Sequence, residues 1–229
     1  MLLPSPDTSL GHLYARLSNW IALDDFEQAL ADYFKGPRSK AELADYRAKR
    51  GAVKKLRDEV VPVLHHLKFA KARGEIRFEL NSDVPDCWLR GASGAVPQGL
   101  EITVAQSREQ QRLGQLMNQT KGMVPGYLGL ADDDPEALYR ERLARGRIMH
   151  STEGALTVIG NGIKSCLRKK NHSKYTGHDL LIEAPLLSVP NERWIRIEDD
   201  LRTAASAMPF RKIHVIGDQD RSPFGFRIK

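Results

Sequence analysis

Two acidic residues, Asp86 and Glu101, stand at a spacing that can bring their carboxylates side by side. Asp86 follows a proline at the start of a short run, 85–90, and Glu101 lies in a second run, 99–105, beyond the turn residues Ser93-Gly94. If these runs pair as a hairpin about that turn, Asp86 lies directly opposite Glu101, where like charges repel unless a proton or a cation lies between them. Carboxylate oxygens are ligands that Mg²⁺ prefers. The spacing therefore predicts a site for Mg²⁺ or Mn²⁺, and a surface hairpin with two solvated acids is the alternative.

The same register divides the hairpin side chains between two faces, because successive residues of a strand point in opposite directions. One face is expected to be polar and to carry Asp86, Trp88, Glu101 and Thr103. The other is apolar and is expected to face the core; it carries Cys87, Leu89, Leu100, Ile102 and Val104.

The elements that must hold this hairpin follow from hydrophobic periodicity. Helical spacing predicts an N-terminal set of helices over residues 10–21, 24–33 (capped by Asp24) and 39–67 (capped by Ser39, kinked at Pro62). A switch to alternating residues after Gly74 predicts a strand over 76–80, so that this strand and the two hairpin runs form a three-stranded meander.

The second half alternates helices with apolar strands. We expect helices over 106–121, after 132–135, over 152–171 and over 196–207, and strands over 179–184 and 212–217. Gly160 and Gly162 weaken the third of these helices and leave a short strand over 156–159 as its alternative. The order predicts an α/β fold with a mixed sheet flanked by helices, comprising a helical N-terminal region (residues 1–73) and a core (residues 74–229) in one compact unit.

The motif Pro85-Asp86, followed by Glu101-Ile102-Thr103, resembles the PD-(D/E)xK nuclease superfamily. The order of elements around residues 74–187 agrees with that family's restriction-endonuclease-like fold. The resemblance implies a magnesium-dependent nuclease in which Asp86 and Glu101 bind Mg²⁺ with help from the Ile102 carbonyl. It also implies a further acid on an N-terminal helix, for which Glu27, Glu42 and Glu59 are candidates; Glu59 is preferred because its helix is nearest the meander in sequence.

One position departs from the family pattern: Thr103 stands where the motif lysine is expected. A threonine hydroxyl donates a hydrogen bond but brings no positive charge to a phosphate. We expect Lys169 or Lys174 to supply the charge, and Gln106, just past the strand, is a candidate for orienting water.

The overall charge is positive, with 35 Lys+Arg against 29 Asp+Glu among 229 residues, a formal charge of +6. A basic surface favours a polyanionic partner, and we expect nucleic acid, specifically DNA. The candidate phosphate-contacting residues cluster near the end of the 152–171 helix, where a solvated helix end is the alternative interpretation; they are Lys164, Arg168, Lys169, Lys170 and Lys174.

Other classes of site find little support. No apolar run is long enough to span a membrane, and two isolated cysteines with no leader pattern favour a reducing, cytoplasmic setting. The segment Gly160-Asn161-Gly162-Ile163-Lys164-Ser165 resembles a phosphate loop superficially, but that loop requires glycine directly before its lysine.

The sequence thus predicts a magnesium-dependent deoxyribonuclease. A nuclease-like fold that binds nucleic acid without cleaving it is the first alternative, because of Thr103. A protein-interaction scaffold is the second. The oligomeric state is open, with a homodimer as one option.

Overall fold

The computed structural model describes residues 8–81, 83–91, 95–120, 124, 128–145, 151–218 and 223–229. The helices are α1 (Ser9–Leu17), α2 (Leu23–Lys35), α3 (Lys40–Arg47), α4 (Val53–Lys55), α5 (Val61–Ala70), α6 (Ser107–Gln119), α7 (Glu136–Ala144), α8 (Thr152–Lys169) and α9 (Ile195–Ser206), with a π-helical segment η1 (Leu56–Val60) and short 3₁₀ turns η2 (Ser173–Tyr175), η3 (Leu186–Ser188) and η4 (Asn191–Arg193). The strands are β1 (Ile21–Ala22), β2 (Glu75–Phe78), β3 (Cys87–Arg90), β4 (Gln98–Val104), β5 (Asp179–Ala184), β6 (Ile213–Gly217) and β7 (Gly225–Arg227).

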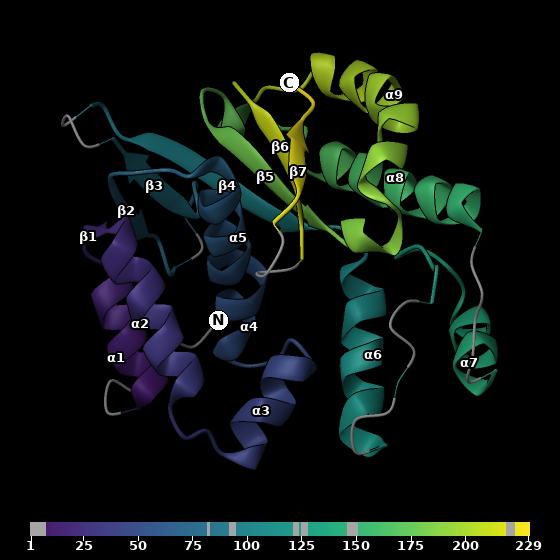
Figure 1. Ribbon diagram of the computed structural model, residues 1–229, viewed down its shortest axis with the longest axis horizontal. Helices are drawn as coiled ribbons and strands as arrows, with labels where there is room; N and C mark the ends of the chain where they lie inside the picture. The colour runs from purple at the N-terminus through teal and green to yellow at the C-terminus, as the bar shows by residue number, and fades with distance from the viewer. Residues whose placement is uncertain are drawn as a thin grey trace.

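The strands form one mixed sheet whose spatial order follows the chain from β1 to β7 (Figure 1). Strands β1 to β4 pair antiparallel, β4, β5 and β6 run parallel, and β7 returns antiparallel along the far edge. The expected mixed α/β architecture and the three-stranded meander are therefore confirmed. The parallel strands require crossovers, which α6 to α8 and then α9 provide.

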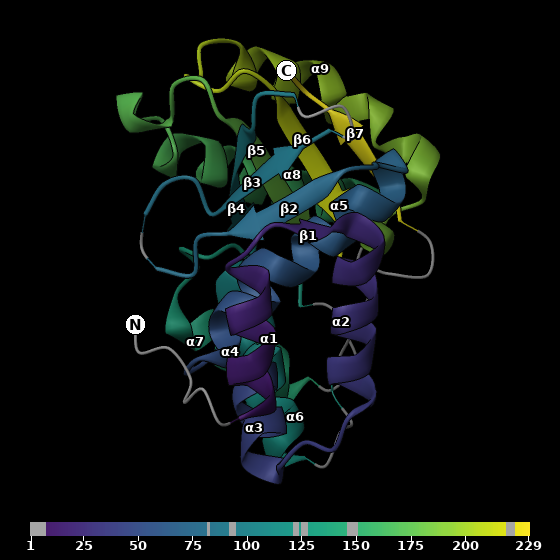
Figure 2. The same cartoon turned by 90° about the vertical axis from the view of Figure 1, so that its left-hand side faces the viewer.

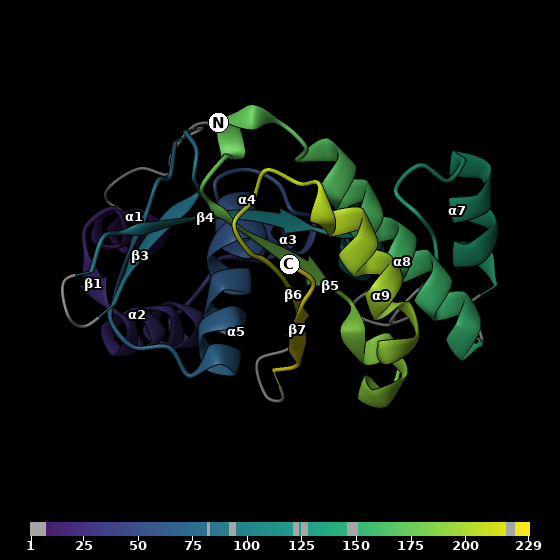
Figure 3. The same ribbon diagram turned by 90° about the horizontal axis from the view of Figure 1, so that it is seen from above.

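Helices cover the sheet on both faces, and β5 contributes apolar side chains to both: Leu181 packs in one core cluster, and Leu180 and Ile182 pack in the other. One core cluster joins the N-terminal helices to the sheet and includes Leu10, Phe26, Leu100 and Ile216. A second cluster joins α8 and α9 to the opposite face of β5 and β6. Seen from above, α8 and α9 lie on one side of these strands and α5 on the other (Figure 3). The N-terminal helices thus pack directly on the sheet of the core.

A smaller group of helices extends beyond the sheet, where α3 packs against α6 at the lower end of the molecule (Figure 2). Their approach is close enough that a Cβ added at Gly114 would lie 1.8 Å from the Arg47 carbonyl oxygen. The Arg57 guanidinium donates to the carbonyls of Tyr46 and Arg47 at 2.8 and 2.6 Å, and so completes the end of α3.

The expected single helix over 39–67 is wrong. The chain leaves α3 and turns through Lys49 and Gly51, both at positive φ (52° and 61°), before α4 begins. A π-helical segment then precedes Pro62, which lies in the first turn of α5 where its missing N–H costs little. Periodicity could not reveal this break, because apolar residues continue at helical spacing on both sides of it.

Two further expectations near the N-terminus are wrong. The residue that caps α2 is Ala22, and Asp24 lies inside the first turn. Ile21, expected at the end of a helix, instead pairs with Ile76 as strand β1. The cap at Ser39 is confirmed, since its hydroxyl accepts from the Glu42 N–H at 3.0 Å.

The 152–171 helix is confirmed as α8, and the strand alternative over 156–159 is wrong. Its N-cap Ser151 accepts from the Gly154 N–H at 3.1 Å. Among the residues that the structure describes, no helix is long and apolar enough to cross a membrane.

Candidate active site

The hairpin register predicted from the sequence is present in the sheet. Cys87 pairs with Leu100 and Trp88 with Gly99, so the next step along the ladder brings Asp86 beside Glu101. Strand β3 begins at Cys87, whereas β4 continues to Val104, so the last residues of β4 have no strand partner on that edge among the described residues. The candidate site lies along this open edge.

Asp86 is anchored to β4 by its side chain. One carboxylate oxygen accepts from the Ile102 N–H at 2.7 Å. Because the N–H and C=O of one strand residue point to the same side, the Ile102 carbonyl belongs to the same edge as the Asp86 carboxylate.

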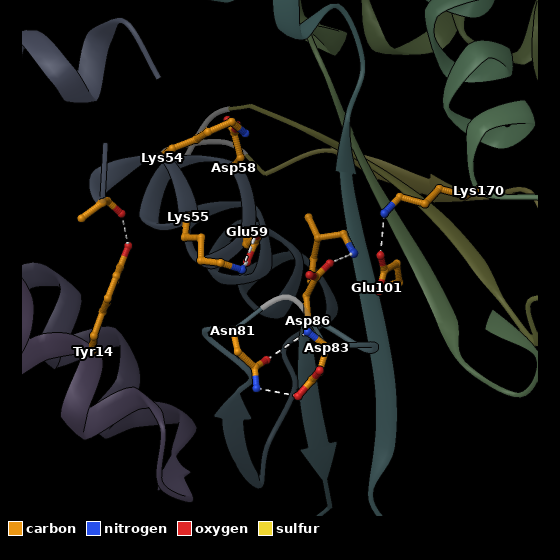
Figure 4. Close-up of polar contacts among 12 residues, drawn as sticks. Tyr14, Lys54, Lys55, Asp58, Glu59, Asn81, Asp83, Asp86, Glu101 and Lys170 are labelled. Carbon is orange, nitrogen blue, oxygen red and sulfur yellow. Dashed lines mark hydrogen bonds and ion pairs between the residues drawn. The ribbon is translucent and has the colours of Figure 1, made fainter. Parts of the chain in front are cut away.

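Glu101 is almost fully buried, with 3% of its surface exposed. Its Oε1 lies 2.5 Å from the Nζ of Lys170, which follows α8, while its Oε2 is buried without a hydrogen-bond partner among the described residues (Figure 4). Burying an unpartnered carboxylate oxygen is costly, so this atom has capacity for a further ligand.

A third acid comes from η1. Glu59 accepts from Lys55 Nζ at 2.9 Å, and burial raises the pKa of Glu59. Figure 4 shows Glu59 and Lys55 on the helix side of β4 and the Lys170–Glu101 pair on the other, with Asp86 between them. Burial raises the pKa of Asp86 to about 7, with further contributions from the negative charges of Glu59 and Glu101. The three acids therefore interact electrostatically at one place.

A cavity of about 240 Å³, here called the β4-edge cavity, opens beside Glu59 and Ile102, whereas Asp86 and Glu101 are not among the residues that line it. Its walls come from six segments of the chain: α4, η1, the end of β4, the start of α6, the loop before α7, and α8. Its lining includes Glu59, Ile102, Thr103, Asp132, Cys166 and Lys169. The open edge of β4 is thus accessible to a molecule of modest size.

The expected residues separate into those at this cavity and those away from it. Thr103 lines the cavity and donates to the sulfur of Cys166 at 3.7 Å. Lys169 also lines it, with 65% of its side chain exposed and its Nζ 4.0 Å from Asp132. Gln106 is 1% exposed and donates to the Leu130 carbonyl at 3.0 Å, so it is buried behind the residues that line the cavity.

The other basic residues diverge around the end of α8. Lys174 lies on η2 with its Nζ 4.8 Å from the centre of the Tyr175 ring. Lys164 pairs with Asp200 of α9, and Arg168 is exposed. Of the five basic residues singled out near the end of α8, the one that pairs with Glu101 is Lys170, which the sequence placed only among the phosphate-contacting residues. Consecutive helical residues point about 100° apart, so periodicity alone could not rank Lys170 above Lys169.

The candidate helix acids are also separated. Glu27 pairs with Lys68 at 2.9 Å, and Glu42 accepts from the Tyr33 hydroxyl. Of the three candidates, Glu59 alone lines the β4-edge cavity.

The chemistry of this donor set fits a hard divalent cation. Asp86 and Glu101 offer carboxylate oxygens, one of them buried without a partner among the described residues, and Ile102 offers a carbonyl. As the side chains stand, no three His, Cys, Asp or Glu residues in the described segments are close enough together to form a metal site. Lys170 pairs with Oε1 of Glu101, and Lys55 pairs with the carboxylate of Glu59.

The comparisons with known proteins give no relative. No protein-family model matches the chain. No curated protein and no solved structure matches it either. The function therefore has to be inferred from the site itself.

Proposed function

We propose that this protein is a Mg²⁺- or Mn²⁺-dependent nuclease of the PD-(D/E)xK type that hydrolyses phosphodiester bonds in DNA. The observation that carries the proposal is the meeting of Asp86 and Glu101 at an open strand edge, where the pKa of Asp86 is raised to about 7 and one buried oxygen of Glu101 has no partner among the described residues. Two acids that repel each other beside a cavity are stabilised by a bound cation, which is the arrangement that metal-dependent hydrolysis requires.

The residues of the chain divide the task. Asp86, Glu101 and the Ile102 carbonyl would hold the cation, which when bound neutralises phosphate charge and lowers the pKa of a water molecule. Glu59 lines the β4-edge cavity next to Ile102 and has a raised pKa, so it is positioned to exchange a proton with water there. The sheet and α8 exclude solvent from the buried side of Glu101.

Thr103 brings no positive charge to the site, but lysines at the end of α8 can supply one. Lys170 lies against Glu101, and Lys169 lines the cavity. The ammonium group of Lys170 also lowers the pKa of Asp86, although burial and the neighbouring acids raise it more. We therefore assign the positive charge to Lys170 and Lys169, whereas the sequence suggested Lys169 or Lys174.

The test is cleavage of linear and circular DNA with Mg²⁺ or Mn²⁺. Asp86→Ala and Glu101→Ala are expected to lower the rate at least about 100-fold, and chelation should abolish it. Asp199→Ala, which removes an exposed carboxylate of α9, is the matched control and should cleave at the wild-type rate. Equal cleavage by Asp86→Ala, Glu101→Ala and wild type would reject the assignment.

A second candidate is a nucleic-acid-binding module that has lost catalysis. Two observations favour it: Thr103 contributes no charge, and Lys170 already satisfies one oxygen of Glu101. This candidate predicts salt-dependent DNA binding that weakens when Arg168 and Lys169 are neutralised, without cleavage and without Mg²⁺ binding. Calorimetric titration with Mg²⁺ near neutral pH separates the two candidates, because the nuclease must bind the ion and lose that binding in Glu101→Ala.

A further inference from the structure

A second cavity adjoins the candidate active site. It measures about 210 Å³ and lies between α8 and the loop that leads into α7. We call it the α8 cavity; its polar lining residues are Asp132, Asp133, Asn161, Ser165, Arg168 and Lys169. At about 30 Å³ for each water, its volume corresponds to roughly seven water molecules, a space suited to one planar heterocycle rather than to a large ligand.

The two cavities share some of their walls. Asp132, Cys166 and Lys169 line both of them. The ion pair between Lys169 and Asp132, at 4.0 Å and with the lysine side chain 65% exposed, stands at their common boundary. Exposed ion pairs of this length contribute little to stability, so a ligand can readily displace it. A molecule that spans both cavities would pass this boundary.

One wall of the α8 cavity is a stripe of polar side chains on α8. Asn161, Ser165 and Arg168 follow at intervals of four and three residues, which places them along the same side of the helix. Gly162 lies beneath them, and a Cβ there would meet the Gln106 side chain at 3.3 Å. A glycine inside a helix costs about 1 kcal/mol relative to alanine, and this close approach explains why one is used here. Asn161 and Gly162 therefore belong to a cavity wall and not to a phosphate loop, and a Cβ at Gly160 would meet Ile197 of α9 at 3.1 Å.

The opposite wall is a loop that α6 holds in place. Glu109 is 3% exposed and accepts from the N–H groups of Leu128 and Leu130 at 2.9 and 2.7 Å. Arg108 binds the next stretch of the loop through the carbonyls of Asp132 and Asp134 at 3.1 and 2.8 Å. A buried carboxylate that accepts from two loop amides builds a fixed wall, and a preorganised wall reduces the ordering cost of binding.

The chemistry of the two walls favours a base over a phosphate. The carboxylates of Asp132 and Asp133 repel a phosphate group, whereas amide, carboxylate and guanidinium side chains are those that pair with the edges of bases. Asp133, Asn161 and Arg168 are all exposed and supply one of each. Together they offer both donors and acceptors within one small cavity.

We propose that the α8 cavity is a subsite for the nucleobase adjacent to the bond that is cut, and that it gives the protein a base preference at that position. This proposal rests on the proposed nuclease function, since the β4-edge cavity would hold the phosphate. The subsite reads a base that is unpaired or flipped out, because a cavity of this size cannot admit a base pair.

The experiment measures binding and cleavage separately. Binding of fluorescein-labelled single-stranded DNA octamers, each of one base, is measured by anisotropy with EDTA present, so that the result does not depend on catalysis. Wild type is expected to prefer one base by at least about fivefold, and Asn161→Ala and Asp133→Ala to reduce that ratio toward one. Asp199→Ala serves as the matched surface control and should keep the preference. Cleavage products of a randomised single strand with Mg²⁺ are then sequenced.

The outcomes distinguish the two proposals. A base preference in binding that Asn161→Ala removes, without any cleavage, supports base binding in the α8 cavity but rejects the nuclease, and with it a position next to a cut bond. Cleavage without base preference at either neighbouring nucleotide, or with a preference that both variants retain, rejects the subsite and leaves the nuclease standing. If all octamers bind equally and the variants change nothing, the subsite is rejected and the α8 cavity holds only water.

Discussion

Replacing Asp86 with asparagine tests whether burial and the neighbouring acids disfavour a charged carboxylate at this position in the folded protein. The fold holds the pKa of this carboxyl at about 7, compared with an ordinary value of 3.8, chiefly because of burial and then because of Glu59 and Glu101. The folded protein therefore binds this proton more tightly than the unfolded chain does. The contribution of this carboxyl to stability is greatest below about pH 4 and falls as pH rises from about 4 to about 7, where the carboxyl must ionise.

The magnitude follows from the difference in pKa. About three pH units at about 1.4 kcal/mol each give a ceiling of about 4 kcal/mol. Asp86 retains some contact with solvent, so we expect about half of that, roughly 2 kcal/mol, to appear experimentally. Asparagine can still accept from the Ile102 N–H and carries no charge.

The assay is urea unfolding in EDTA at three pH values, about 4, 6 and 8. Asp86→Asn should match wild type at the lowest pH and exceed its free energy of unfolding by about 2 kcal/mol at the highest. Glu101→Gln is the contrasting control; it weakens the ion pair with Lys170 and should lower stability at the highest pH. If Asp86→Asn is no more stable than wild type there, burial and the neighbouring acids do not raise the pKa of Asp86 as we infer.

Three further variants test other regions of the structure. Lys170→Ala leaves the buried carboxylate of Glu101 without its cation and should lower the free energy of unfolding at neutral pH by about 3 kcal/mol. Added Mg²⁺ should partly reverse this loss. Equal stability of the variant and wild type would show that the ion pair is solvated. Glu109→Ala removes the acceptor of the buried N–H groups of Leu128 and Leu130, so their amide hydrogen exchange should accelerate at least about tenfold. Unchanged exchange rates would contradict a loop held by this side chain. Gly114→Ala places a Cβ 1.8 Å from the Arg47 carbonyl oxygen and should cost about 1–3 kcal/mol in thermal or urea unfolding, whereas a neutral result would mean that α3 and α6 separate freely.

Local patterns predicted most of the sheet. Alternation identified β2 and β4, the apolar run identified β5, and the turn at Ser93-Gly94, although it lies outside the described residues, gave the correct register between β3 and β4. Register is strongly specified there because a slip of one residue would move Leu100 and Ile102 away from the core. The short edge strands β1 and β7 escaped prediction, since two or three residues carry no measurable period.

Helix boundaries were predicted less well where backbone geometry decides them. The interruption between α3 and α4 depends on left-handed residues at Lys49 and Gly51, and a lysine gives no local signal for that conformation. The π-helical segment likewise has no signature in apolar spacing.

The sequence by itself determined which residues could form an acidic pair and which strands would carry them, because strand alternation and hairpin register are local properties. Tertiary structure decided which partners meet that pair. Glu59 reaches it from a helical segment far earlier in the chain, and Lys170 from a helix end far later, and both arrive only because helices pack on the two faces of one sheet. The pKa of Asp86, the burial of Glu101 and the two adjoining cavities arise from that packing, since desolvation and Coulomb interaction depend on distance in space and not on distance along the chain.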